Sequence, residues 1–81
     1  MFTVYALYSG KFDKIYIGFT SNLPQRLLSH NELATKGWTI KFRPWIVIYT
    51  EEYDKKPEAL KREKQLKSFR GRQFIRNLIN K

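Results

Sequence analysis

The first twenty residues contain two short stretches that are rich in β-branched and aromatic side chains, at residues 2–8 and 15–20. This composition is typical of β-strands. The turn residues at 9–14 form a short connection, which favours an antiparallel hairpin. Gly18 lies inside the second stretch, where a glycine often marks the close approach of another group. The pattern therefore predicts a hairpin in which a neighbouring group packs against Gly18.

The next apolar positions recur at helical spacing. Asn22 is a suitable N-cap and Pro24 suits a first helical turn, so we expect a helix at residues 23–32 with Leu23 and Leu27 on its core side. Residues 33–44 read as a connection that Trp38, Ile40 and Phe42 partly order. Residues 45–51 are expected to be the third strand, the most apolar of the three.

Two further helices are predicted in the C-terminal third. Pro57 suits the start of a helix over residues 57–69, and a break is expected at residues 68–71, before a last helix at 72–80. The expected apolar sides of these helices are Ala59, Leu60, Leu66 and Phe69 in the first, and Phe74, Ile75, Leu78 and Ile79 in the second. The order β-β-α-β-α-α indicates an α+β fold, a small three-stranded antiparallel sheet flanked by three helices. A chain of 81 residues allows one domain, residues 1–81.

The charge of the chain is large and uneven. Sixteen Lys and Arg against seven Asp and Glu give a net charge of +9. Residues 1–54 hold six basic and five acidic side chains, whereas residues 55–81 hold ten basic and two acidic ones. The electric field of such a charge distribution attracts polyanions, above all nucleic acid. The alternatives are binding to an anionic membrane surface, or a basic face that is only solvated. The candidate nucleic-acid contacts are Lys61, Arg62, Lys64, Lys67, Arg70, Arg72 and Arg76.

Composition excludes several kinds of covalent or metal site and a membrane-spanning segment. The absence of cysteine excludes disulfides, a thiol nucleophile and cysteine-based metal sites. The longest unbroken apolar run, residues 45–49, is far too short to span a membrane, and no secretory signal is visible. We therefore expect a cytoplasmic protein that does not span a membrane and whose leading partner is nucleic acid and not a membrane.

Five polar residues are candidates for chemistry, and each also has an ordinary structural explanation. Tyr5 and Tyr16 suit strands, but a short hairpin would bring both to one face. Arg26 and His30 lie four residues apart on one helical row, where a guanidinium suits phosphate oxygens and an imidazole titrates near neutrality. Glu63 could pair with Lys67 one turn later, or it could hold a hard cation such as Mg²⁺.

Taken in order, these residues match a known pattern. Thr3-Val4-Tyr5 is followed after eleven residues by the tyrosine of Tyr16-Ile17-Gly18, and Arg26, His30 and Glu63 come at matching intervals. The constellation resembles the GIY-YIG nuclease superfamily, in particular small stand-alone bacterial members related to the nuclease domain of the DNA-repair excinuclease. The resemblance covers nearly the whole chain.

The resemblance implies a metal-dependent endonuclease that hydrolyses DNA phosphodiester bonds with a single divalent cation, Mg²⁺ or Mn²⁺. One of the two tyrosines, with His30, would help to deprotonate the attacking water. Arg26 would hold the phosphate and Glu63 the metal ion, while Gly18 would be a structural motif residue. The enzyme would be weakly specific or structure-selective, or would take its specificity from a partner protein.

The chain also departs from the family pattern. The first motif begins Thr-Val rather than Gly-Ile, and Phe19 stands where some relatives carry a lysine near the phosphate. The alternative interpretation is therefore a nucleic-acid-binding module of the same fold that lacks catalysis and uses its basic C-terminal half. A third hypothesis is docking of that half onto a protein partner or a membrane surface.

Overall fold

The computed structural model describes residues 1–80, and Lys81, the last residue of the predicted domain, lies outside the described residues. The elements are β1 (Phe2–Ser9), β2 (Lys14–Thr20), α1 (Leu23–Leu28), the π-helical turn η1 (Ser29–Leu33), the 3₁₀ helix η2 (Trp38–Phe42), β3 (Ile46–Tyr53), α2 (Lys56–Lys67) and α3 (Phe69–Ile79). The order β-β-α-β-α-α and the α+β class are confirmed. No helix within residues 1–80 is long and apolar enough to cross a membrane.

The sheet is antiparallel and has the strand order β2-β1-β3, so β1 is its central strand. Tyr5 pairs with Gly18 on β2, and Leu7 pairs with Tyr16. Because side chains alternate along a strand, Tyr5 and Tyr16 share one face of the sheet, as the hairpin pattern predicted. A bulge between Ala6 and Leu7 interrupts the pairing with β3.

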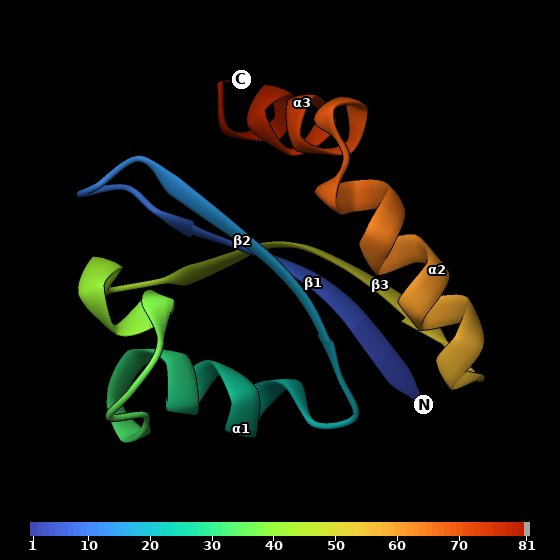
Figure 1. The fold of residues 1–81 in the computed structure, drawn as a ribbon, viewed down its shortest axis with the longest axis horizontal. Coiled ribbons are helices and arrows are strands. Elements are labelled where there is room, and N and C mark those ends of the chain that lie inside the picture. Colours follow the sequence, from blue (N-terminus) through green and yellow to red (C-terminus); the bar gives the residue numbers. More distant parts are fainter. Residues whose placement is uncertain (81) are drawn as a thin grey trace.

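The sheet separates two apolar clusters. The cluster on one face joins the sheet to α2 and α3, and that on the other face joins it to α1 and η2 (Figure 1). The buried members of the first cluster are Val4, Ala6, Ile15, Ile17, Ala59, Leu66 and Ile75. The second has Tyr5, Leu7 and Trp45 at its centre, with Leu23 and Leu27 of α1 packed against them. Tyr5 is thus part of a core as well as of the candidate site.

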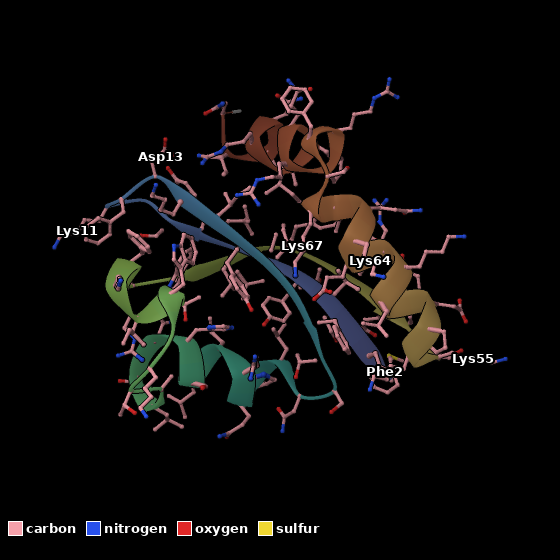
Figure 2. All side chains as sticks on the ribbon, in the orientation of Figure 1. Phe2, Lys11, Asp13, Lys55, Lys64 and Lys67 are labelled. Carbon is pink, nitrogen blue, oxygen red and sulfur yellow. The ribbon has the colours of Figure 1, made fainter. Side chains whose placement is uncertain are left out.

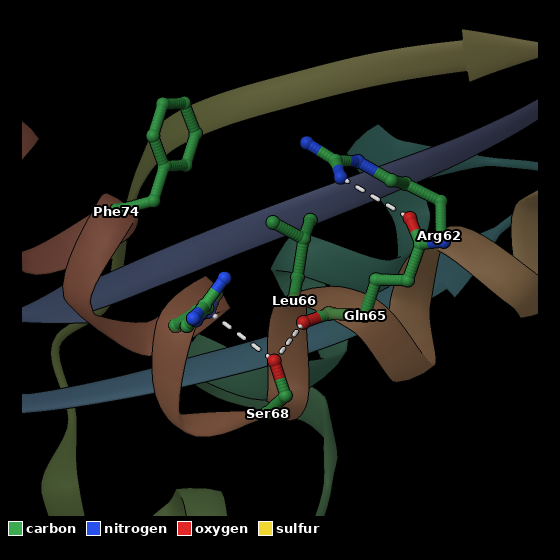
Figure 3. Close-up of a pocket in the computed structure, with 7 residues that line it drawn as sticks. Arg62, Gln65, Leu66, Ser68 and Phe74 are labelled. Atoms are coloured by element: carbon green, nitrogen blue, oxygen red, sulfur yellow. Dashed lines mark hydrogen bonds between the residues drawn. The ribbon is translucent and has the colours of Figure 1, made fainter.

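The helices break within the expected range 68–71, but the break is shorter than expected, because Ser68 alone separates α2 from α3 (Figure 3). The Ser68 hydroxyl accepts a hydrogen bond from the Gly71 N–H at 3.3 Å, so the residue that ends α2 is also the N-cap of α3. Gly71 then lies against the end of α2, where a side chain would overlap the backbone of Gln65 and Leu66. The sharp turn also leaves Phe69 at 76% exposure, although the helical pattern predicted that it would be buried.

Two other boundaries differ from the predictions. The helix expected at residues 23–32 is α-helical only to Leu28 and then widens into η1. The third strand, expected at residues 45–51, begins at Ile46 and ends at Tyr53. Trp45 precedes it, where the Asn31 side chain accepts a hydrogen bond from the Trp45 N–H at 2.6 Å and donates one to its carbonyl at 2.9 Å. This side-chain pairing takes the place of a strand ladder at Trp45.

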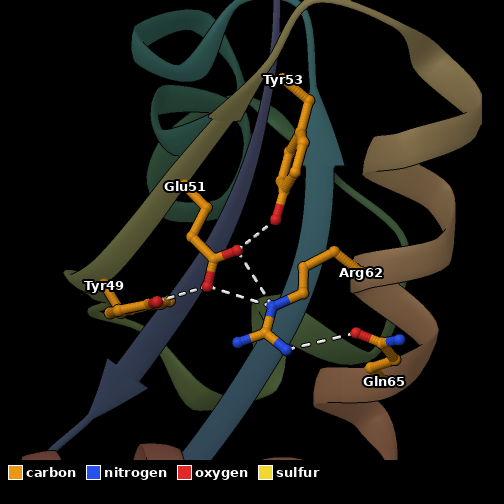
Figure 4. Close-up of polar contacts among 5 residues, drawn as sticks. All are labelled: Tyr49, Glu51, Tyr53, Arg62 and Gln65. Carbon is orange, nitrogen blue, oxygen red and sulfur yellow. Dashed lines mark hydrogen bonds and ion pairs between the residues drawn. The ribbon is translucent and has the colours of Figure 1, made fainter.

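A polar network ties α2 to β3 on the first face of the sheet (Figure 4). The Glu51 carboxylate accepts hydrogen bonds from the hydroxyls of Tyr49 and Tyr53, and Arg62 Nε lies 3.0 and 3.1 Å from its two oxygens. Burial acts to raise the pKa of Glu51, but the hydrogen bonds from Arg62, Tyr49 and Tyr53 outweigh it and hold the pKa below its usual value. The network fixes how α2 is rotated against the sheet.

Candidate active site

A cleft of about 360 Å³ opens between β2, α1 and the two short helices. Its lining includes five of the side chains discussed below, Tyr16, Arg26, His30, Trp38 and Thr39, together with Lys36. Three of the predicted site residues therefore share one cavity. Tyr5 lies directly beneath it, because its hydroxyl is 3.0 Å from His30 Nε2.

Gly18 is what allows the two tyrosines to meet. A Cβ atom at this position would lie 2.7 Å from the Tyr5 hydroxyl, 2.8 Å from Tyr5 Cζ and 3.1 Å from a ring carbon of Tyr16. The two rings have centroids 6.3 Å apart over this open space. The close approach that the glycine predicted is confirmed, and the approaching group is Tyr5.

His30 is held at both ring nitrogens. Nε2 faces the Tyr5 hydroxyl and Nδ1 lies 3.0 Å from the Thr39 hydroxyl. All three residues are buried, at 1% exposure for Tyr5, 6% for His30 and 8% for Thr39. The ordinary explanation for His30, a solvated helix surface, does not fit a side chain fixed in this way. Its ring has a defined position and orientation in the floor of the cleft.

Burial and neighbouring charges set the protonation states of Tyr5, His30 and Arg26. Burial raises the pKa of Tyr5 to about 12, although the neighbouring Arg26 opposes the shift, so Tyr5 is a neutral phenol near pH 7. Burial also lowers the pKa of His30, and the positive charges of Arg26 and Arg43 lower it further. Interaction with Tyr5, and then with Tyr16, raises the pKa of Arg26. Near pH 7 the site thus combines a neutral imidazole, a neutral phenol and a permanent cation.

Glu63 occupies a different place. It lies on the row of α2 that also carries the buried Ala59 and Leu66, and its side chain is only 15% exposed. Lys67 Nζ is 3.7 Å from its carboxylate, which is the ion pair that the spacing allowed. Glu63 is not among the described residues that line the cleft. The negative charge of Glu63 nevertheless contributes to the raised pKa of Tyr5, so Glu63 influences the residues at the floor of the cleft.

The structure divides the predicted nucleic-acid contacts into two groups. Arg62 pairs with Glu51, Lys67 with Glu63 and Arg76 with Asp13, so each of these cations faces an acid of the same chain. The exposed remainder are Lys61, Lys64, Arg70 and Arg72. Figure 2 shows Lys64 and Lys67 on α2, the helix that packs on the face of the sheet opposite to the cleft. The cleft has its own cations, Arg26 and Lys36.

Sequence reasoning missed the residues that complete the cleft from η2. Thr39 and Trp38 come from the segment that was expected to be a connection. Arg43 fixes the end of this segment to η1 by donating hydrogen bonds to the carbonyls of Ser29, His30 and Ala34. The aromatic residues of that segment were the visible signal. No spacing rule could show that Thr39 meets His30, because their contact depends on how the chain folds back.

Comparisons with known proteins identify the family of this chain. The sequence model of the GIY-YIG catalytic domain matches residues 1–76. The chain belongs to the GIY-YIG family. It is 32% identical over 66 residues to a UPF0213 protein of Staphylococcus haemolyticus, covering 82% of this chain and 80% of the relative. It is 36% identical over 59 residues to one of Staphylococcus saprophyticus, covering 73% and 72%. No solved structure matches.

Membership in the GIY-YIG family gives the observed residues their context. The match includes both strands of the hairpin, in which Tyr5 pairs with Gly18 and Leu7 with Tyr16. The GIY-YIG family is a family of nucleases, and the resemblance drawn from the sequence is thereby confirmed. The UPF0213 relatives are small proteins of which this chain covers most of the length.

Proposed function

We propose that this protein is a metal-dependent endonuclease that hydrolyses DNA phosphodiester bonds at the cleft lined by Tyr16, Arg26 and Trp38, with weak sequence specificity or with selectivity for DNA structure. One observation carries the proposal. The fold brings Arg26, Tyr16 and the hydrogen-bonded pair of Tyr5 and His30 together at one cavity, although they come from different elements. A module that only bound nucleic acid would need cations on its surface, but it would not need a buried phenol–imidazole pair.

The structure supports different roles for the two tyrosines. Tyr16 lines the cleft, so its hydroxyl is the one that meets the attacking water and orients it towards the phosphorus. Tyr5 is 1% exposed and its pKa of about 12 keeps it protonated near neutral pH. We therefore assign Tyr5 as the donor to Nε2 of neutral His30, whose Nδ1–H then points to the Thr39 hydroxyl. Tyr5 and His30 together position the floor of the site.

Arg26 is suited to the phosphate. It is exposed, it lines the cleft, and its neighbours Tyr5 and Tyr16 raise its pKa, so its charge is permanent. Its planar fork can donate two hydrogen bonds to the phosphate oxygens and stabilise the charge that develops on them. Lys36 adds a second positive charge to the same cavity.

Glu63 would hold the single divalent cation, Mg²⁺ or Mn²⁺. It does not line the cleft, but it is close enough for its charge to raise the pKa of Tyr5. Among residues 1–80 there is no cluster of three or more acidic or histidine side chains that could enclose a metal ion. A hard cation needs no such cluster when water and a substrate phosphate complete its coordination. The Glu63 carboxylate is largely enclosed and its one ion-pair partner, Lys67, is a long exposed side chain at 3.7 Å that can move aside. When bound, the cation supplies Lewis-acid stabilisation of the leaving oxygen.

The test is a plasmid-nicking assay with Mg²⁺ or Mn²⁺, and with EDTA, on the wild type and on Glu63→Gln. Gln is nearly isosteric and forms helices as well as Glu, so the fold is expected to survive while a neutral amide replaces the metal ligand. We expect nicking to fall below detection and DNA binding to hold or rise slightly, because a negative charge has been removed.

The matched control is Glu58→Gln on the same helix. Glu58 is exposed in the first turn of α2, where it complements the helix dipole, so its loss is expected to cost a fraction of a kcal/mol and to leave nicking unchanged. Equal behaviour of the two variants would contradict the assignment of the metal to Glu63. Wild-type protein that binds DNA but never nicks it would instead support the non-catalytic binding module.

A further inference from the structure

Trp38 is unusually exposed for a residue in the wall of a site. It is 46% exposed, whereas Trp45 behind it is 2% exposed. Packing holds the Trp38 ring in place, with Phe42 at 4.7 Å and Trp45 at 5.9 Å between ring centroids. A fixed aromatic ring with nearly half of its surface open, beside a cavity that contains Arg26, offers a stacking surface next to a phosphate site.

The ring is part of a continuous aromatic row, defined by Phe12, Phe42, Trp38 and Tyr16. Its successive ring centroids are 5.5, 4.7 and 6.5 Å apart. The row begins at the tip of the β1–β2 hairpin, where Phe12 is 39% exposed, and ends in the cleft at Tyr16. Its rings therefore lead from the protein surface to the residues assigned to hydrolysis.

Lysines accompany this row. Lys11 Nζ lies 5.5 Å from the centroid of Phe12 and Lys14 Nζ lies 5.6 Å from that of Phe42, while Lys36 lines the cleft beside Trp38. Figure 2 shows Lys11 and Asp13 at the hairpin tip. Asp13 is the acid at this tip, and Arg76 neutralises it with a guanidinium nitrogen 2.5 Å from its carboxylate.

We propose that the aromatic row binds an unpaired stretch of DNA, with one nucleobase stacked on Trp38 while the adjoining phosphodiester lies at Arg26. Alternating rings and cations are the features that hold a single strand, since bases stack on the rings and phosphates meet the lysines. Paired bases in a duplex keep their faces covered by their neighbours and cannot stack on Trp38. The inference rests on the proposed function and names its substrate class: single strands, or junctions that carry an unpaired strand.

The experiment measures binding without hydrolysis, in EDTA, by fluorescence anisotropy of a labelled single-stranded oligonucleotide and of the blunt duplex made from it. We expect Trp38→Ala to weaken single-strand binding about 5- to 150-fold, which corresponds to the loss of one stacked base, and to change duplex binding little. Trp38→Phe keeps a ring and is expected to retain most of the affinity. Phe69→Ala is the matched control, because Phe69 is an exposed aromatic residue on α3, away from the row.

Intrinsic fluorescence gives a second readout that does not depend on a destabilising change. Trp38 and Trp45 are the two tryptophans of the chain, and a base on Trp38 should quench the wild-type emission. In Trp38→Phe only the buried Trp45 remains, so the quenching should disappear while the protein still binds. Unquenched wild-type emission at saturation, or an equal loss of single-strand and duplex affinity in Trp38→Ala, would overturn the proposal.

The outcome also separates this inference from the proposed function. Wild-type protein that shows single-strand quenching but never cleaves DNA in Mg²⁺ or Mn²⁺ would refute the nuclease and leave the stacking surface in place. Wild-type protein that cleaves DNA, with a Trp38→Ala variant that binds and cleaves single strands equally well, would refute the stacking surface alone.

Discussion

The substitution Gly18→Ala changes one hydrogen into a methyl group at the contact between the two motif tyrosines. The new Cβ would lie 2.7 Å from the Tyr5 hydroxyl, whereas ordinary contact begins at 3.4 Å, so the hydroxyl must move by about 0.7 Å. Tyr5 cannot yield easily, because it is 1% exposed and packed in the second core. The movement acts directly on its 3.0 Å contact with His30.

The expected loss of stability follows from two opposing effects. Overpacking a core costs about 1–3 kcal/mol, while replacing a glycine in a strand by alanine returns about 0.5–1 kcal/mol. We expect a net loss of about 1–2 kcal/mol in the free energy of unfolding, measured as a lower urea midpoint at unchanged slope. Nicking should fall more than stability suggests, by about 10- to 100-fold, because small misplacements of catalytic groups are costly.

Two comparisons test this reasoning. Gly10→Ala is the control, because the nearest atom to its new Cβ, in Tyr8, is at an ordinary 3.5 Å, so stability and nicking should stay near wild type. In a Tyr5→Phe background the closest clash is absent, while the contacts with the ring carbons of residue 5 at 2.8 Å and of Tyr16 at 3.1 Å remain, so Gly18→Ala should cost less there. A Gly18→Ala protein with the urea midpoint and nicking rate of the wild type would refute the account.

Three further outcomes are expected. Glu51→Gln should lower the free energy of unfolding by about 1–3 kcal/mol, because Arg62 loses its partner. The folded-state pKa of Glu51 is depressed, so its stabilising contribution is present above the unfolded-state pKa and is lost as pH falls through the folded-state pKa. The difference between variant and wild type should therefore vanish at low pH, which urea titrations at several pH values would show. Arg26→Ala should reduce nicking by about 10²–10³-fold with only a modest loss of DNA affinity, and a wild-type rate would place Arg26 outside the site. With about four exposed cations on α2 and α3 in contact with phosphates, log K against log salt for duplex DNA should slope by roughly −3 to −4, and salt-independent binding would contradict that surface.

Local sequence patterns predicted the three strands, the three α-helices and their order. Alternation in residues 2–8 and 15–20 placed the hairpin, and its side-chain period put Tyr5 and Tyr16 on one face with a gap at Gly18. The spacing of Arg26 and His30 put them on one helical row. These features depend on near neighbours in the chain, which is why the pattern of residues could predict them.

The surroundings of those residues follow from long-range packing instead. Thr39 reaches His30, and Trp38 reaches Tyr16, because residues 34–45 fold back onto η1 and β2, a path that no periodicity encodes. Phe69 was expected to lie on the buried side of the second helix. It is exposed because the chain turns at the single capping residue Ser68, so that Phe69 becomes the first residue of α3. Glu63 lies outside the lining of the cleft because α2 packs on the first core. Contacts between residues far apart in the sequence arise from the packing of whole elements, and the free energy that selects them is shared among many side chains.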